Sequence, residues 1–252
     1  MEKPTDFSPV VYGGKVYDTT FFLLLGGVSS DSWLAPEMSV ARFRGEVTYS
    51  LHSLTQQAKY FIWGETPEFS PTCKNYSIGT EASLDESGFV GVVDGWSVSK
   101  RDVAELSDGG GIYQQAVLDW LKAEGVTRPE LGDLHIYRVD LEGNGSDEIF
   151  ISATRNDGPS QLTKTGDHST ILMRKIQGNE VATVFIAGEV YRGPETATFL
   201  HRTYSIANFI DLNQDGVLEV VVENQGWERF GASVYQVEDQ SITQVLQAGC
   251  GL

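Results

Sequence analysis

The sequence predicts a mainly β protein with one amphipathic helix, and three observations support this fold class. Short segments rich in β-branched and aromatic residues recur along most of the chain. Turn-forming Gly, Asn and Asp residues separate these segments. One segment, 112–125, instead has apolar residues at helical spacing, and Gly125 ends it. The chain of 252 residues is long enough to bury a large core, as one large β domain or two smaller ones.

Residues 1–105 are predicted to form a β-rich N-terminal region. Degenerate blade-like units and a separate β domain are both compatible with its sequence. Strands are expected at 15–25, 40–43, 46–51, 58–63, 89–93 and 96–99. Residues 31–38 are expected to be irregular, and residues 65–86 to form a long polar connection. Residues 106–133 comprise the helix and its connection.

Residues 134–252 are predicted to contain two repeated units. In each unit a strand leads into an acidic loop, and three further strands follow. The expected strands are 134–140, 148–154, 170–176 and 181–187, then 205–211, 219–223, 232–237 and 242–247. Four strands per unit is the plan of a propeller blade, so the repeats predict propeller-like four-stranded blades, in a partial or a small propeller.

The two acidic loops share one pattern of side chains, counted from the first aspartate of each. Oxygen-bearing side chains stand at positions 1, 3, 5 and 9, and Gly stands at position 6, where a sharp turn is needed. Position 7 would contribute only its main-chain carbonyl. The predicted ligands of the first loop are Asp140, Glu142, Asn144, Ser146 and Glu148. Those of the second loop are Asp211, Asn213, Asp215, Val217 and Glu219.

This oxygen-rich pattern predicts two Ca²⁺ sites, because Ca²⁺ prefers six to eight oxygen ligands. A helix–loop–helix calcium site would also need a bidentate Glu at position 12, where this chain has Ile151 and Val222. β-Branched and aromatic residues follow each loop, so each loop is expected to lead into a strand. The Ca²⁺ is predicted to be structural, because it would neutralise clustered carboxylates.

The loops and the strands after them resemble the FG-GAP/VCBS-type repeats of integrin α-chain heads and of many bacterial surface or secreted proteins. The resemblance covers roughly residues 134–250, and the second loop is the closer match to the DxNxDG pattern. The first loop departs from it at Glu142 and Asn144. The resemblance implies a Ca²⁺-rigidified propeller that binds its ligand elsewhere on its surface. It also implies a secreted, periplasmic or cell-surface location.

The connection that contains Trp227, Arg229 and Phe230 is the predicted ligand-binding segment. Aromatic groups flanked by polar groups often hold sugars or peptides, and loops often carry function. The alternative, which the sequence favours for Trp227, is a place in the core between the units. The ligand, a protein or a carbohydrate, is not specified by the sequence.

No catalytic residue is predicted, and whether the protein is an enzyme stays open, with a non-enzymatic role favoured. Asp167, His168 and Ser169 are the residue types of a catalytic triad, but neighbours on a strand point to opposite faces. The leading hypothesis is a Ca²⁺-binding module with a binding or structural role. The alternative is a hydrolase, with carbohydrate as a candidate substrate, that uses unlocated carboxylates on a propeller-like scaffold.

The charge and the cysteines limit the partners and the compartment. A net charge of −17 argues against nucleic acid, and the longest apolar run is too short to insert into a membrane. The first residues do not look like a signal peptide, so we expect either a cytoplasmic protein or an exported one whose leader has been removed. Cys73 and Cys250 are the two cysteines, and either a disulfide or two free thiols are compatible with the sequence.

Overall fold

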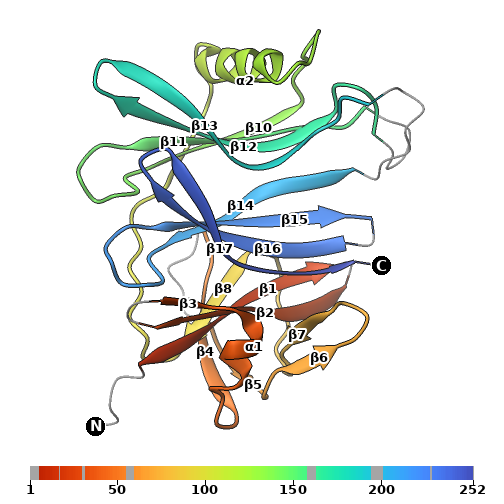
Figure 1. Ribbon diagram of the computed structural model, residues 1–252, viewed down its shortest axis with the longest axis vertical. Coiled ribbons are helices and arrows are strands. Elements are labelled where there is room, and N and C mark those ends of the chain that lie inside the picture. The colour runs from red at the N-terminus through yellow and green to blue at the C-terminus, as the bar shows by residue number, and fades with distance from the viewer. Residues whose placement is uncertain are drawn as a thin grey trace. The chain divides into compact units, whose positions relative to one another are not determined.

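The computed structural model describes residues 6–16, 18–29, 32–54, 60–157, 163–193, 201–227 and 229–251. Within these residues the protein is mainly β, and its strands form three antiparallel sheets (Figure 1). The chain divides into two compact units. The first comprises residues 1–100, 206–223 and 228–252, and the second comprises residues 101–205 and 224–227.

The N-terminal sheet belongs to the first unit and has the strand order β5-β4-β8-β1-β2-β7-β6, with β3 paired to β2. Strands β1 and β2 form an antiparallel pair at its centre, and β8 pairs with the other edge of β1. A short helix, α1 (Pro36–Val40), follows β3. The strands are β1 (Phe7–Val16), β2 (Thr19–Ser29), β3 (Ser32–Leu34), β4 (Val47–His52), β5 (Tyr60–Gly64), β6 (Glu68–Ser70), β7 (Asn75–Ser77) and β8 (Phe89–Val93).

The central strands of this sheet are buried on both faces. In β2, Phe22 and Leu24 pack into one apolar cluster, whereas Leu23 and Leu25 pack into another. Successive side chains of a strand point to opposite faces, so a strand with a core on each side needs an unbroken apolar run. This explains the run of apolar residues at 21–25.

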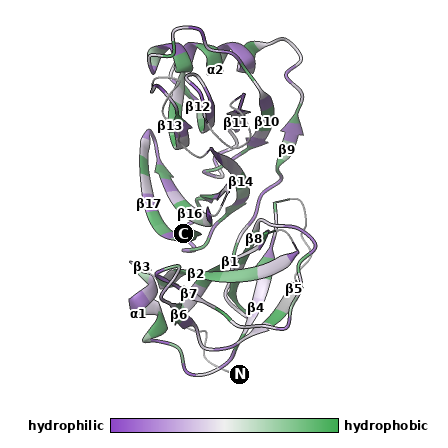
Figure 2. Ribbon diagram, turned by 90° about the vertical axis from the view of Figure 1, so that its right-hand side faces the viewer, coloured by the Kyte–Doolittle hydropathy of each residue, from purple (hydrophilic) through white to green (hydrophobic). Residues whose placement is uncertain are grey.

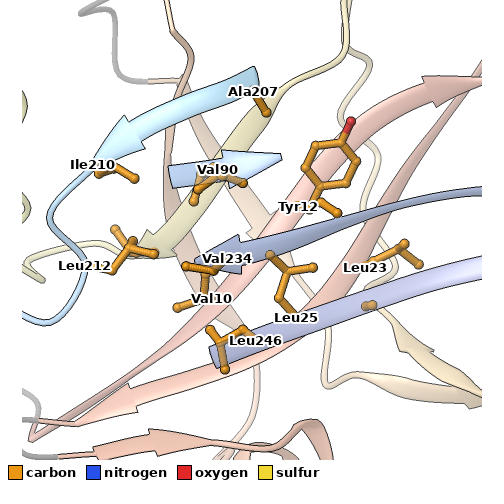
Figure 3. Close-up of a cluster of buried hydrophobic side chains, with 14 of the residues drawn as sticks. Val10, Tyr12, Leu23, Leu25, Val90, Ala207, Ile210, Leu212, Val234 and Leu246 are labelled. Atoms are coloured by element: carbon orange, nitrogen blue, oxygen red, sulfur yellow. The ribbon is translucent and has the colours of Figure 1, made fainter. Parts of the chain in front are cut away.

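The second sheet is a four-stranded meander in the order β14-β15-β16-β17. Its apolar residues pack against the N-terminal sheet in a shared cluster, to which Ile210, Val234 and Leu246 contribute from the meander and Val10 and Leu25 from the N-terminal sheet (Figure 3). All five side chains are at most 3% exposed. The strands are β14 (Arg202–Ile210), β15 (Glu219–Gly226), β16 (Arg229–Glu238) and β17 (Ser241–Gly251).

The second unit contains a five-stranded sheet in the order β13-β12-β11-β10-β9 and one longer helix, α2 (Ile112–Ala123). Val117 and Leu121 of α2 are fully buried against Ile136, Ile151 and Leu172 of the sheet. The helix also carries hydrophilic residues, as Figure 2 shows. The strands are β9 (Ala104–Leu106), β10 (Asp133–Val139), β11 (Glu148–Arg155), β12 (His168–Gln177) and β13 (Glu180–Val190).

The structure confirms the strands predicted for both repeats and the amphipathic helix, which is α2, and it adds a short helix, α1, that was not predicted. Each repeat forms four consecutive antiparallel neighbours, β10–β13 and β14–β17. The tight turns predicted after the third strands are also present, because Gln177 pairs with Glu180 and Glu238 with Ser241. These predictions succeeded because alternating apolar residues and turn residues are local signals.

Several predictions for the N-terminal region were wrong. Residues 15–25, expected to form one strand, include the end of β1 and the first part of β2, and β1 begins at Phe7. Residue 40 is the last residue of α1 and residues 41–43 follow it, so the strand expected at 40–43 does not form. Pro36 is the first residue of this helix, a position that proline favours. The regions expected to be irregular or a long connection contain β3, β6 and β7, and β9 was missed. Residues 96–99 form no strand, although Ser99 makes an isolated bridge with Asp211.

A disulfide joins Cys73, in the turn between β6 and β7, to Cys250 in β17, and the two cysteines are 177 residues apart in sequence. It thereby connects the N-terminal sheet to the last strand of the meander. Disulfides persist in oxidising compartments, so this one is consistent with an extracellular or periplasmic protein. Within the described residues, no helix is both long and apolar enough to cross a membrane.

Replacing both cysteines with serine is expected to lower the free energy of unfolding by about 3–5 kcal/mol, because the bond restricts a very long loop of the unfolded chain. Guanidinium unfolding of the double variant against the oxidised parent measures this. The parent with dithiothreitol provides the control and should match the variant. An unchanged unfolding midpoint, together with two reactive thiols in the denatured parent, would contradict the pairing.

Candidate metal sites in two acidic loops

Each acidic loop connects the first two strands of a four-stranded meander. The first loop joins β10 to β11, and the second joins β14 to β15. In both, position 2 is a buried leucine, Leu141 or Leu212, and position 9 is the first residue of the next strand. The position 9 glutamates, Glu148 and Glu219, are 2% and 1% exposed. The loops are therefore anchored at both ends in the apolar core of their own unit.

The two loops have the same left-handed residues. Position 4 has a positive φ in both, 68° at Gly143 and 66° at Gln214. Position 6 also has a positive φ, 82° at Gly145 and 89° at Gly216. Glycine adopts this conformation at no steric cost, which explains position 6. Gln214 carries a Cβ in the same region and is strained there.

The second loop is held together by hydrogen bonds from its main chain to its acidic side chains. Gln214 N and Gly216 N donate to the two carboxylate oxygens of Asp211 over 2.7 and 3.1 Å. Val217 N donates to Asp215 Oδ1 over 2.8 Å. Leu212 N donates to Glu219 Oε2 over 2.8 Å, which joins the start of the loop to its end. The amide of Asn213 also donates to Asp215 Oδ2.

The first loop repeats three of these hydrogen bonds at the same positions. The position 6 N–H of Gly145 donates to Asp140 Oδ2, and the position 7 N–H of Ser146 donates to Asn144 Oδ1. The position 2 N–H of Leu141 donates to Glu148 Oε2 over 2.8 Å. Two loops that differ at positions 3, 4, 5, 7 and 8 therefore share these three hydrogen bonds and the left-handed residues at positions 4 and 6.

The electrostatics of the two buried glutamates differ. Burial raises the pKa of Glu219 to about 8, and the carboxylates of Asp215 and Asp211 add to the rise. Burial also raises the pKa of Glu148, but the Lys175 ammonium opposes that rise. At Asp140, desolvation disfavours the charge, yet the main-chain donors of residues 143–145 and Arg101 outweigh it and leave the pKa below its usual value.

The predicted ligands do not form a ready-made metal cage. Among the described residues, no three His, Cys, Asp or Glu side chains converge as metal ligands. In the second loop the carboxylates of Asp211, Asp215 and Glu219 instead accept hydrogen bonds from main-chain N–H groups. A carboxylate has about four acceptor positions, however, so one or two such bonds leave the others available to a cation. The donor set is entirely oxygen, which fits Ca²⁺ in its chemistry.

The three residues of the predicted ligand-binding segment have different environments. Trp227 lies in the turn after β15 and is 49% exposed, so its predicted core position is wrong. Arg229 is exposed at the start of β16. Phe230 is partly buried and packs against Phe21, with ring centroids 4.0 Å apart. Trp227 and Arg229 are therefore accessible, whereas Phe230 belongs to the core of the first unit.

Asp167, His168 and Ser169 are all buried, and their side chains have different partners. Asp167 accepts hydrogen bonds from the N–H groups of Asp157 and Lys164. Ser169 Oγ is hydrogen-bonded to Thr154 and to Tyr204 N. His168 Nδ1 is bonded to the Gly166 carbonyl.

Sequence reasoning missed a buried polar cluster in the second unit, which includes His168 and His201. His168 Nε2 and both ring nitrogens of His201 have no hydrogen-bond partner among the described residues. Burial lowers the pKa of both imidazoles. At His201 the carboxylates of Asp167 and Glu189 oppose this effect without cancelling it. The two histidines are 33 positions apart, so no local spacing signalled that both would be buried here.

Comparisons with protein families, curated proteins and solved structures found no match to this chain.

The buried histidines predict a loss of stability in mild acid. Their folded-state pKa values are lower than that of an unfolded histidine, about 6.5, so stability is fully present above that pH. It falls as the pH drops further, by at most about 1.4 kcal/mol per pH unit for each imidazole. Urea unfolding at pH 7.5 and 5 should therefore show that the free energy of unfolding falls less between these pH values in His168→Asn and in His201→Gln than in the parent. His135→Gln, at a largely exposed histidine, is the control, and equal pH slopes in all variants would refute the prediction.

The strain at position 4 predicts that Gln214→Gly stabilises the protein by about 1 kcal/mol, because it removes a Cβ from the left-handed region. Gln214→Ala shortens the side chain but keeps the Cβ, so it should have little effect. Thermal unfolding in EGTA compares the variants without metal. A glycine variant no more stable than the alanine variant would show that the strain is negligible.

Proposed function

We propose that this chain is a Ca²⁺-binding β protein with a non-enzymatic binding or structural role. The observation that carries the proposal is the repeated loop conformation, in which different residues keep the same three hydrogen bonds and the same buried glutamate. The residues that would hold the ion in the second loop are Asp211, Asn213, Asp215, the Val217 carbonyl and Glu219. Their counterparts at positions 1, 3, 5, 7 and 9 of the first loop have the same donor chemistry.

The proposed role of Ca²⁺ is structural, because the buried glutamates can stay ionised only beside a positive charge. A carboxylate removed from water is costly to keep ionised unless it is paired or coordinates a metal. Among the described residues, no lysine or arginine forms an ion pair with Asp215 or Glu219. A divalent cation supplies that charge and links the end of β14 to the start of β15. Binding would then stabilise the folded chain directly.

The propeller-like arrangement is part of the same proposal. Each meander of four sequential antiparallel strands has the strand order of a propeller blade, and the acidic loop lies at the same strand junction in both. The FG-GAP/VCBS resemblance supports this assignment. It also supports a secreted, periplasmic or cell-surface location, with which the disulfide is consistent.

A protein or carbohydrate is the proposed ligand class. The accessible Trp227 and the exposed Arg229 support it individually, because an indole offers a flat apolar face and a guanidinium pairs with acidic or hydroxyl groups. The charge of −17 disfavours nucleic acid. The hydrolase alternative gains no support from Asp167, His168 and Ser169, whose side chains have separate partners.

Calcium is expected to raise the melting temperature. Sites of this kind have dissociation constants of about 10⁻⁴–10⁻³ M. At 10 mM CaCl₂ one site then adds about 1.5–3 kcal/mol of stability, or roughly 3–10 °C. Scanning calorimetry in CaCl₂ and in EGTA measures the difference, and MgCl₂ at equal ionic strength controls for screening.

Glu219→Gln is the matched variant for this test. Its side-chain carbonyl can still accept the hydrogen bond from Leu212 N, so the loop keeps its internal bond while losing a charged ligand. The variant should lose most of the Ca²⁺-dependent rise. A parent whose melting temperature is the same in CaCl₂ and EGTA would remove the structural-metal proposal.

A further inference from the structure

Strand β13 is the outermost strand of the five-stranded sheet, and among the described strands it pairs only with β12. The edge of a sheet presents main-chain N–H and C=O groups to other chains, and proteins ordinarily protect it with lysine, proline or a bulge. Residues 181–188 contain no charged residue and no proline. A bulge at Ile186 interrupts the register with β12, so the regular, uncharged part of this edge runs from Val181 to Phe185.

Exposed apolar side chains lie along this edge on one face of the sheet. Val181 and Phe185 are 52% and 41% exposed, and Ile176, which pairs with Val181 across the hairpin, is 66% exposed. Phe185 pairs with Leu172, which packs against α2, and alternate residues of a strand share a face. Trp120 of α2 stacks on Phe185, with ring centroids 5.5 Å apart. Helix α2 therefore covers this face as far as Phe185 and leaves the Ile176–Val181 pair exposed.

The side chains of this edge are complementary to a second copy of the same edge. Residues directly opposite each other in a sheet point to the same face, so a two-fold axis that relates two β13 strands must pass through a residue. With the axis at Thr183, each Val181 lies opposite Phe185 of the second copy, and the two Thr183 residues lie opposite each other. Both kinds of cross-strand pair are favourable. An axis one residue earlier would leave Phe185 opposite the hairpin turn, and one residue later would extend the pairs across the bulge.

Charge permits this pairing at short range. No charged residue stands in the paired stretch, so no like charges would lie directly opposite each other. Arg174 pairs with Thr183 from β12 and shares its face. The two Arg174 residues would be three strand spacings apart, about 14 Å, which is farther than the Debye length of about 8 Å at physiological salt. At longer range the net charge of −17 makes two copies repel each other.

The area of the surface sets the strength of the association. The paired stretch and the side chain of Ile176 would bury on the order of 500 Å² per copy, near the lower limit of specific interfaces, about 600 Å² per partner. An interface of this size between two acidic chains is that of a weak dimer, which forms at high protein concentration.

We propose that the outer edge of β13 is a dimerisation surface, on which a second copy of this chain adds its own β13 in antiparallel orientation about a two-fold axis at Thr183. Two five-stranded sheets then join into one continuous sheet, and apolar neighbours from the other copy cover Val181 and Phe185. The inference goes beyond the proposed function, because it involves none of the residues proposed to hold Ca²⁺.

Sedimentation velocity at protein concentrations from about 10 to 500 μM tests the association, since this range suits a weak interface. The mean mass of the parent is expected to rise toward that of a dimer, and to rise further at high NaCl concentration, because salt screens the repulsion. Val181→Lys should lower the association constant at least tenfold, because each lysine would lie opposite Phe185 of the other copy. Met38→Lys, at an equally exposed residue of the first unit, is the control and should associate like the parent.

Thr183→Cys tests the position of the axis, and it decides the question if Val181→Lys does not fold. Both native cysteines are in the disulfide, so the variant has one free thiol per chain. Directly opposite residues of antiparallel strands have Cα atoms about 4.5–5.5 Å apart, which a disulfide can span. Mild oxidation should therefore link Thr183→Cys into a covalent dimer at least tenfold faster than Met38→Cys, as measured by non-reducing electrophoresis.

Three results would overturn the proposal. They are a parent that stays monomeric at every protein and salt concentration, an association that Val181→Lys leaves unchanged, and equal cross-linking rates in the two cysteine variants. None of them bears on the proposed function, which is tested by the effect of Ca²⁺ on the melting temperature.

Discussion

The burial of a glutamate at the end of each acidic loop is the constraint on which the rest of the site depends. Glu148 and Glu219 begin β11 and β15, where a strand interior would ordinarily exclude a carboxylate. Each accepts the N–H of the leucine at position 2, so the loop closes on itself as the strand begins. The charge that this arrangement buries has to be neutralised by a proton, an ammonium or a metal.

The two loops share three main-chain hydrogen bonds but have different neighbouring side chains. Lys175 lies beside the first loop and opposes the rise in the pKa of Glu148. The carbonyl at position 2 accepts a hydrogen bond from Arg101 in the first loop and from the uncharged indole of Trp96 in the second. The two repeats therefore share a fold but differ in the side chains that approach the loop from outside it.

The first unit depends on contacts between residues that are distant in sequence. Its N-terminal sheet has an apolar cluster on each face, and one of these is completed by the C-terminal meander. The Cys73–Cys250 disulfide and the hydrogen bond from Asn75 to Gly249 join the same parts of the chain. Tyr12 of β1 likewise donates to Glu223 of β15. The N-terminal sheet and the last two strands therefore stabilise each other.

The sequence by itself determined the mainly β class, the helix at 112–123, the eight strands of the two repeats and the positions of the two acidic loops between them. Periodicity, turn residues and spacing are local, so they can be read without coordinates. It did not determine the short strands β3, β6 and β7, whose residues are held by pairing with β2 and with each other. Only the tertiary structure decided that Trp227 is exposed, that His168 and His201 are both buried, and that Lys175 reaches Glu142. Each of these depends on which distant segments pack together, because burial and charge pairing are set by neighbours in space rather than by neighbours in the chain.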